Sequence, residues 1–221
     1  MKAFVLAAGR GERLRPLTDT MPKPLIKAGA YSLIEYHLRN LQRAGISEVV
    51  INISWLGEQI KKTLGDGSLY HLNIDYSDEG NEALETAGGI IKALPLVGDN
   101  PFLVINADIW TDFDLTNLAH QTIDSEAHLV LVDNPEHNIK GDFSLNHNLV
   151  TNSGSPMLTY SGIGIYTKEF FNGYAAGKRS LAPILRSKID ANHISGEHYR
   201  GQWTDVGTIE RLNTLNAMLT E

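Results

Sequence analysis

A short apolar strand that runs directly into a glycine-containing loop opens the chain. Residues 4–6 predict a buried strand, and the small residues that follow include Gly9 and Gly11. Such a loop lets backbone N–H groups approach a bulky anion, most simply a phosphate chain. Residues 1–27 carry six Lys or Arg against two Asp or Glu, whereas the whole chain has a net charge of −7. This contrast favours a small polyanion over a nucleic acid, which would need a broad basic face.

Two better-known phosphate-binding loops are excluded by the same stretch. A P-loop requires the pattern G-x-x-x-x-G-K-[ST], which does not occur in the sequence. The dinucleotide-binding pattern G-x-G-x-x-G requires a third glycine where this chain has Leu14. The loop therefore indicates a different class of phosphate-binding site.

The length and composition predict a single α/β domain, residues 1–221, with a sizeable core. The chain contains no cysteine, which excludes disulfides, thiolate metal ligands and a cysteine nucleophile. The amino-terminal apolar run does not resemble a signal peptide, and no stretch approaches the roughly 18 apolar residues of a membrane span. We therefore expect a cytoplasmic enzyme that has no membrane partner.

Strands and helices alternate through the first half of the chain. Apolar and β-branched runs predict strands, and a capping box formed by Ser32 and Glu35 predicts the start of a helix that stops at Gly45. The expected strands are 4–6, 48–53, 72–76 and 101–106, and the other expected helices are 58–64 and a stretch that follows the Gly-rich segment 84–90 and ends at Leu94. This rhythm predicts an α/β fold with a mostly parallel central sheet and helices on both faces. Ligands of such sheets bind at the carboxyl ends of the strands.

The alternation breaks between about Asp133 and Ser161, where Asn and Gly are frequent. We expect an antiparallel excursion over one side of the sheet, with residues 152–156 as an exposed hairpin tip. Thr208 is expected to cap a carboxyl-terminal helix. The remaining expected elements are a strand at 160–167, a helix at 181–189 and a short strand at 203–206.

Two carboxylates are expected at the carboxyl edge of the sheet, beside the glycine loop. Asp108 follows the apolar strand 101–106, and Asp205 lies in the short strand 203–206. Hard carboxylate oxygens suit Mg²⁺, which keeps water ligands and bridges to substrate phosphates. We therefore predict that Asp108 and Asp205 together bind Mg²⁺.

The amino-terminal loop resembles the signature of the sugar-1-phosphate nucleotidyltransferases. The motif that carries this resemblance is Gly9-x-Gly11-x-Arg13-Leu14-x-Pro16-Leu17-Thr18, followed by Pro22-Lys23-Pro24. Other stretches resemble the family over nearly the whole chain, namely Glu35–Leu38, Trp55–Gly57, Leu84–Gly89, Asn106–Trp110 and Gly196–Gly201. These stretches look most similar to the branch that uses N-acetylmuramic acid 1-phosphate in peptidoglycan recycling.

The resemblance implies a Rossmann-like nucleotidyltransferase fold and a role for each matching residue. The nucleotide-binding part would be about 1–110, the acceptor-binding part about 111–206 and the terminal helix about 208–220. The implied nucleotide-binding residues are Gly9, Gly11, Glu12, Arg13 and Lys23, of which Arg13 and Lys23 would be catalytic. Asn106 and Asp142 would bind the sugar phosphate, and Asp108 and Asp205 would hold Mg²⁺. Ala87 and Ala107 stand where the family pattern leads us to expect glycine.

Recognition of the base is expected within residues 77–89. Backbone N–H groups there, together with Glu85 or Gly88, could read the edge of a pyrimidine. These residues do not by themselves distinguish uracil from thymine or cytosine. Only the resemblance implies uracil.

The reaction implied by the resemblance is the Mg²⁺-dependent transfer of UMP from UTP to N-acetylmuramic acid α-1-phosphate. A cation among Lys140, His198 and Arg200 would pair with the lactyl carboxylate of this acceptor. Alternatives are another acceptor, such as glucose 1-phosphate, mannose 1-phosphate or phosphocholine, and a non-catalytic nucleotide-sensing protein on the same fold. The sequence leaves the oligomeric state open, with a monomer among the alternatives.

Overall fold

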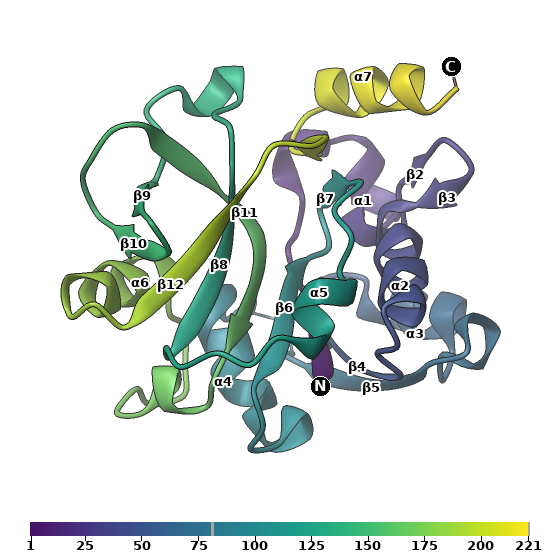
Figure 1. Ribbon diagram of the computed structural model, residues 1–221. Coiled ribbons are helices and arrows are strands. Elements are labelled where there is room, and N and C mark those ends of the chain that lie inside the picture. The colour runs from purple at the N-terminus through teal and green to yellow at the C-terminus, as the bar shows by residue number, and fades with distance from the viewer. Residues whose placement is uncertain (81, 221) are drawn as a thin grey trace.

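Four parallel strands form the first half of the central sheet in the computed structural model, which describes residues 1–80 and 82–220 (Figure 1). They are β5 (Asn73–Asp78), β4 (Glu48–Ile53), β1 (Lys2–Leu6) and β6 (Phe102–Asn106), in this spatial order. The apolar runs that predicted them are buried because helices cover both faces of the sheet. The predicted α/β class and the parallel pairing of these strands are confirmed.

Helices lie on both faces of the parallel strands, as the sequence predicted. On one face α2 (Leu33–Arg43) and α3 (Gly57–Leu64) pack against Ala3 and Val5 of β1. On the other face α4 (Glu85–Val97) packs against Phe4, because successive strand residues point to opposite faces. The capping box of α2 is present, since the Ser32 backbone N–H donates to the Glu35 carboxylate at 2.8 Å.

The second half of the sheet is mostly antiparallel and curls back on itself. Its strands are β11 (Met157–Tyr166), β8 (Ala127–Val132), β12 (Ile194–Tyr199), β10 (Leu149–Thr151) and β9 (Phe143–Asn146). An additional pairing of β11 with β9 closes this set, and α6 (Leu181–Asp190) packs against its apolar side. The expected hairpin tip at 152–156 is wrong. The hairpin joins β9 to β10, and residues 152–156 lead from β10 to β11, which pairs with β6, β8 and β9.

Two small sheets and the terminal helix complete the fold beside the amino-terminal loop. The strands β7 (Ile109–Thr111) and β13 (Trp203–Asp205) pair with each other, outside the central sheet. Helix α7 (Ile209–Thr220) packs Leu212 and Leu215 against Leu14 of the loop. The remaining elements are the helices α1 (Leu17–Thr20) and α5 (Thr116–His120), the strands β2 (Lys27–Ala28) and β3 (Tyr31–Ser32), and the 3₁₀ turns η1 (Glu12–Leu14), η2 (Lys23–Leu25), η3 (Ser68–Tyr70), η4 (Glu136–Asn138) and η5 (Glu169–Phe171). Within residues 1–80 and 82–220, every helix is too short or too polar to cross a membrane.

A buried histidine beneath β7 makes the stability of the fold depend on pH. The Nε2 atom of His37 lies 2.9 Å from the carbonyl oxygen of Ile109. Burial lowers the pKa of His37 from 6.5 to about 4, against the smaller opposing effects of this hydrogen bond and of the Asp108 charge. Below pH 6.5 the unfolded chain therefore takes up a proton that the folded chain resists.

We expect the contribution of His37 to the free energy of unfolding to be complete above pH 6.5. It should be lost as the pH falls towards 4. This difference in the pKa of His37 corresponds to about 3 kcal/mol in the free energy of unfolding. His37→Gln retains a donor for Ile109 but does not titrate, so urea unfolding at pH 7 and pH 4.5 should show a smaller loss than in the wild type. The exposed His71→Gln is the matched control. An identical pH dependence in His37→Gln and wild type would contradict this role.

Candidate active site

The carboxyl ends of β1 and β6 open into a pocket of about 520 Å³. This is the edge of the sheet at which the sequence predicted ligand binding. The lining includes most of the site residues predicted from the sequence, namely Gly9, Gly11, Glu12, Arg13, Lys23, Glu85, Asn106 and Asp108. Gly88, Asp142 and Asp205 lie outside the lining.

The loop after β1 is held in shape by Gly11 and Thr18. Gly11 has a φ of +67°, a left-handed conformation that glycine adopts without steric cost. A Cβ atom at this position would lie 2.9 Å from Cγ2 of Thr18 and 3.1 Å from Cβ of Lys23. The Thr18 hydroxyl donates to the Gly11 carbonyl at 2.9 Å. The loop thus packs directly on Lys23, while the side chains of Glu12 and Arg13 stay exposed along the pocket.

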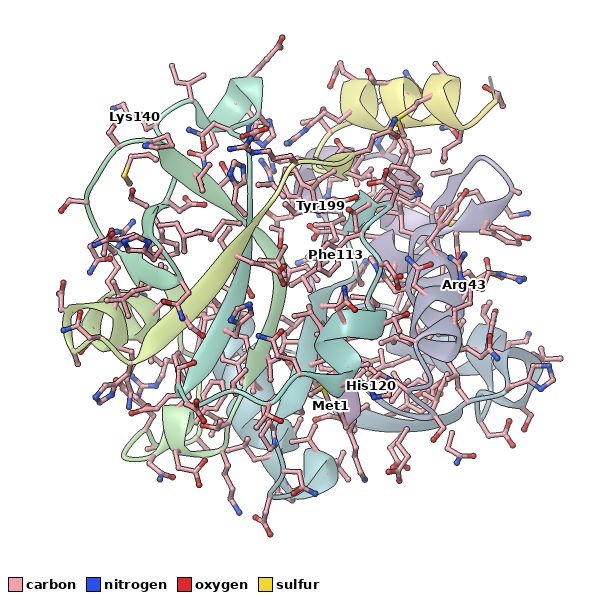
Figure 2. All side chains as sticks on the ribbon, viewed as in Figure 1. Met1, Arg43, Phe113, His120, Lys140 and Tyr199 are labelled. Atoms are coloured by element: carbon pink, nitrogen blue, oxygen red, sulfur yellow. The ribbon has the colours of Figure 1, made fainter. Side chains whose placement is uncertain are left out.

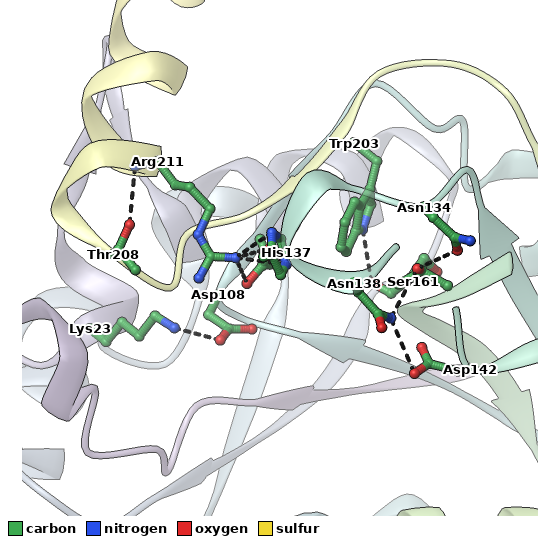
Figure 3. Close-up of polar contacts among 12 residues, drawn as sticks. Lys23, Asp108, Asn134, His137, Asn138, Asp142, Ser161, Trp203, Thr208 and Arg211 are labelled. Carbon is green, nitrogen blue, oxygen red and sulfur yellow. Dashed lines mark hydrogen bonds and ion pairs between the residues drawn. The ribbon is translucent and has the colours of Figure 1, made fainter. Parts of the chain in front are cut away.

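Lys23 and Asp108 form an ion pair at the inner wall of the pocket (Figure 3). The distance from Nζ of Lys23 to Oδ2 of Asp108 is 2.5 Å. Lys23 is the first residue of η2 and is flanked by Pro22 and Pro24. The exposed fraction of the side chain is 9% for Lys23 and 38% for Asp108. A lysine confined in this way is a point charge with few alternative positions. It can therefore neutralise an anion that enters the pocket beside Asp108.

The backbone of Asp205 lies next to that of Asp108, but the Asp205 carboxylate contacts other side chains. The Val206 N–H donates to the Asp108 carbonyl at 2.7 Å, because β13 runs beside β7. Both carboxylate oxygens of Asp205 accept from Nη1 of Arg211, at 2.5 and 2.6 Å. Nε2 of His137 lies 2.9 Å from Oδ1 of the same carboxylate. Asp108 therefore lies in the turn before β7, beside Asp205 of β13, and the Asp205 carboxylate is held by Arg211 of α7 and His137 of η4, which are both labelled in Figure 3.

The donor set fits a hard cation that also binds substrate oxygens. Asp108, in the turn before β7, and Asp205, at the end of β13, supply carboxylates, and each is already matched to a positive charge, from Lys23 and Arg211. In the described parts of the chain, no three side chains of the His, Cys, Asp or Glu type form a metal cluster. Mg²⁺ is commonly held by one or two carboxylates together with water and substrate phosphates, so two carboxylates are a sufficient protein contribution.

The amino end of α4 forms the opposite side of the pocket. Glu85 has a φ of +60°, which is uncommon for a residue with a side chain, and it lines the pocket together with Thr86. Gly88 has a different place. Its N–H donates to the Arg179 carbonyl at 3.1 Å, and a Cβ atom would lie 2.3 Å from the Gly177 carbonyl oxygen. Gly88 therefore lets the segment before α6 pack on α4, and its N–H already has a partner.

Asn106 and Asp142, the two predicted sugar-phosphate ligands, lie in different environments. Asn106 lines the pocket and packs against Gly162, where a Cβ atom would lie 2.6 Å from its Nδ2. The carboxylate of Asp142 accepts from the Tyr160 N–H at 2.9 Å and from Nδ2 of Asn138 at 3.2 Å. Asp142 therefore holds the turn between η4 and β9 against β11.

The three cations proposed for the lactyl group lie away from the pocket lining. Lys140 is exposed on the loop between η4 and β9, at the outer edge of the molecule in Figure 2. His198 lies at the end of β12, with Nε2 2.9 Å from the Asp133 carboxylate. Nε of Arg200 lies 3.5 Å from Nδ1 of His198. Of the three, His198 and Arg200 lie in the segment that leads to Asp205.

Several residues in or beside the pocket were given no individual role from the sequence, although Glu79 lies within the range 77–89 expected to recognise the base. Asn52 and Glu79 line the pocket and are buried, and Arg10 stacks on Trp55 with its guanidinium carbon 4.5 Å from the ring centroid. Arg211, which pairs with Asp205, was expected only as part of a helix. One signal was available: Asn52 is a polar residue within the otherwise apolar run 49–53, and buried polar groups require partners.

Comparison with known proteins identifies the family. Residues 2–141 match the model of the nucleotidyl transferase family. The chain is 52% identical to N-acetylmuramate alpha-1-phosphate uridylyltransferase of Neisseria meningitidis, over 99% of this chain and 98% of that protein. It is 31% identical to the protein of the same name from Caulobacter vibrioides, over 99% of this chain and 97% of that protein.

A solved structure confirms the fold independently. HddC from Yersinia pseudotuberculosis, crystallised with GMP-PN, superposes with a TM-score of 0.80 at 21% identity, over 98% of each chain. The family model covers residues 2–141, and both full-length relatives are more than 30% identical to the chain. The chain therefore belongs to the nucleotidyl transferase family and is a sugar-1-phosphate nucleotidyltransferase.

Proposed function

We propose that the protein transfers UMP from UTP to N-acetylmuramic acid α-1-phosphate, giving UDP-N-acetylmuramic acid and pyrophosphate. The observation that carries this proposal is the placement of the glycine loop, Lys23 and Asp108 in one pocket at the sheet edge. The acceptor and the base are inferred from the two full-length relatives named for this uridylyltransferase. A role in peptidoglycan recycling follows from the same substrate.

The chemistry requires alignment and charge neutralisation rather than proton transfer. A sugar phosphate carries about −1.5 to −2 charges at neutral pH, so its oxygen is already a nucleophile. That oxygen attacks the α-phosphorus of UTP in line, and pyrophosphate leaves. In this proposal Lys23, which lines the pocket, neutralises charge at the α-phosphate, and the planar fork of Arg13 suits the leaving pyrophosphate. The backbone N–H groups at Gly9 and Gly11, with Glu12 beside them, face the triphosphate in this proposal.

Mg²⁺ is the proposed metal, held by Asp108 and Asp205. When bound, it supplies positive charge to the phosphate oxygens. The chain's own contribution is to hold one carboxylate directly before β7 and the other on its partner β13, and to balance them with Lys23 and Arg211. The division into a nucleotide part (1–110) and an acceptor part (111–206) belongs to the same proposal. A cytoplasmic location stays a prediction from the sequence.

Glu85 is the proposed reader of the base, since it lines the pocket at the amino end of α4. Asn106 is proposed to contact the sugar phosphate, because it lies at the end of β6 beside Asp108. Gly88 and Asp142 would act through the position of their neighbours, since the Gly88 N–H and the Asp142 carboxylate already have partners within the chain.

The acceptor can be tested by comparing two sugar phosphates that differ in the lactyl group. We expect kcat/KM for N-acetylmuramic acid 1-phosphate to exceed that for N-acetylglucosamine 1-phosphate by at least about tenfold, or about 1.4 kcal/mol. The reason is that a cation in the acceptor site would pair with the lactyl carboxylate, which N-acetylglucosamine 1-phosphate lacks. Pyrophosphate release measures both rates.

Removing the cation that pairs with the lactyl carboxylate should reduce the preference for N-acetylmuramic acid 1-phosphate. Lys140, His198 and Arg200 are each replaced by glutamine and compared with wild type on both sugars. If the wild type used both sugar phosphates equally well, the natural acceptor would be another sugar 1-phosphate. No pyrophosphate release across a matrix of nucleotides and sugar phosphates would contradict an enzyme of this kind.

A further inference from the structure

Two buried polar side chains lie side by side at the base of the pocket. Asn52, in β4, is 2% exposed, and Glu79, immediately after β5, is 7% exposed. Both line the pocket. Burying an amide and a carboxyl group is costly unless each has hydrogen-bond partners. Their partners therefore show what the pair does.

The hydrogen bonds form one continuous chain across the base of the pocket. The Ala7 N–H donates to Oδ1 of Asn52 at 2.6 Å. Nδ2 of Asn52 donates to Oε1 of Glu79 at 2.6 Å. Oε2 of Glu79 accepts from the Leu84 N–H at 2.6 Å. The chain runs from the backbone before the glycine loop to the backbone at the start of α4.

These two backbone ends belong to the two sides of the nucleotide pocket. Ala7 directly precedes the loop with Gly9 and Gly11, and Leu84 directly precedes Glu85 and Thr86. In the proposed function the first side binds the triphosphate and the second side binds the base. One UTP molecule must contact both sides at once. The separation of the two sides therefore affects how well a single nucleotide fits.

Helix α4 leaves the pair little freedom to move. A Cβ atom on Gly89 would lie 2.4 Å from Oε1 of Glu79 and 2.8 Å from Nδ2 of Asn52. The backbone of α4 thus lies directly against the junction between the two side chains. This close approach is consistent with a fixed spacer rather than with two polar groups that found partners independently.

We propose that Asn52 and Glu79 are positioning residues that hold the phosphate side and the base side of the pocket at a fixed separation. They act through the Ala7 and Leu84 backbones, and so they set the affinity for the nucleotide more than the affinity for the sugar phosphate. This inference rests on the proposed nucleotide site but not on the identity of the acceptor.

The donor and acceptor pattern provides a test that conserves volume. In Asn52→Asp two carboxylates would face each other where an amide donor met an acceptor at 2.6 Å. In Glu79→Gln one amide oxygen must serve two donors, those of Asn52 and Leu84. The double variant Asn52→Asp/Glu79→Gln reverses the central bond: the glutamine amide donates to the aspartate, whose other oxygen still accepts from Ala7, while its own oxygen still accepts from Leu84.

We expect each single substitution to weaken UTP binding at least about tenfold, which is about 1.4 kcal/mol. The double variant should return to within about threefold of wild type, because every hydrogen bond in the chain is restored. The Kd of UTP is measured by calorimetry, and the KM values of UTP and of the sugar phosphate are measured by pyrophosphate release. The KM of the sugar phosphate should change by less than about threefold. Asn73→Asp, at the exposed start of β5, is the matched control and should leave the UTP affinity unchanged.

The outcomes separate this inference from a purely structural role and from the proposed function. Single variants with a lower Tm but a wild-type Kd for UTP would overturn it, as would a double variant no better than the weaker single one. If Asn52→Asp does not fold, the Kd of UTP is compared between Glu79→Gln and the double variant. A double variant that binds UTP no better than Glu79→Gln would overturn the inference. Wild-type protein that binds no nucleoside triphosphate would instead contradict the proposed function.

Discussion

Lys23→Met should lower kcat by about 10²- to 10³-fold, the cost of removing one fixed charge from a transition state in a sheltered site. The reason is geometric as well as electrostatic. Lys23 is held between two prolines, mostly buried, with Nζ 2.5 Å from Asp108. Methionine fills a similar volume but carries no charge. Pyrophosphate release under saturating substrates measures the effect on kcat.

The matched control for Lys23 is Lys27→Met, which removes an exposed lysine in β2, a few residues further along the chain. It should leave kcat within about twofold of wild type, since exposed charges contribute little. The unfolding temperature of Lys23→Met must also be measured, because the substitution leaves the Asp108 carboxylate without its partner. A Lys23→Met enzyme that folds and retains wild-type kcat would remove Lys23 from the catalytic residues.

Asp108→Asn and Asp205→Asn should each lower turnover by at least about 10²-fold while leaving the fold intact. Asparagine has the shape of aspartate but loses the charge that attracts a divalent cation. In both variants, the Mg²⁺ concentration that gives half-maximal activity should be higher than in the wild type. Thermal unfolding with and without Mg²⁺ and UTP gives a second readout that does not depend on turnover.

Asp124→Asn, which removes an exposed carboxylate elsewhere, is the control for both variants. The two aspartates should differ in one respect. Asp205 is paired with Arg211 and lies beside His137, so Asp205→Asn weakens two contacts, whereas the ion pair that Asp108→Asn removes is the one with Lys23. Normal turnover of either variant at sub-millimolar Mg²⁺ would show that the metal ligands have been misassigned.

Local sequence patterns predicted the parallel half of the sheet well because they report local forces. The run 48–53 is observed as a strand with the same limits, and the capping box at Ser32 places the start of α2. The same local information missed the strand 127–132, although all six of its residues are buried. His128 stands within this strand, and the four apolar residues after it, 129–132, are too few for periodicity to separate strand from helix.

The sequence alone determined which residues could line the site on the amino-terminal side. Parallel strands end at one edge of the sheet, so a glycine loop after β1 and Asp108 after β6 must lie near each other once the strand order is parallel. Lys23 could be added because it follows the loop closely between two prolines. These inferences needed only the direction of the strands and the length of the connections.

Only the tertiary structure decided which polar groups are paired. Arg211 of α7 meets Asp205, the Gly88 N–H meets the Arg179 carbonyl, and Asn52 meets Glu79. Each pair joins different elements of the fold, and no periodicity in the sequence records such a contact. The physical reason is that a hydrogen bond depends on atomic separation and direction, which are set by how whole strands and helices pack, whereas burial and propensity act on each segment by itself.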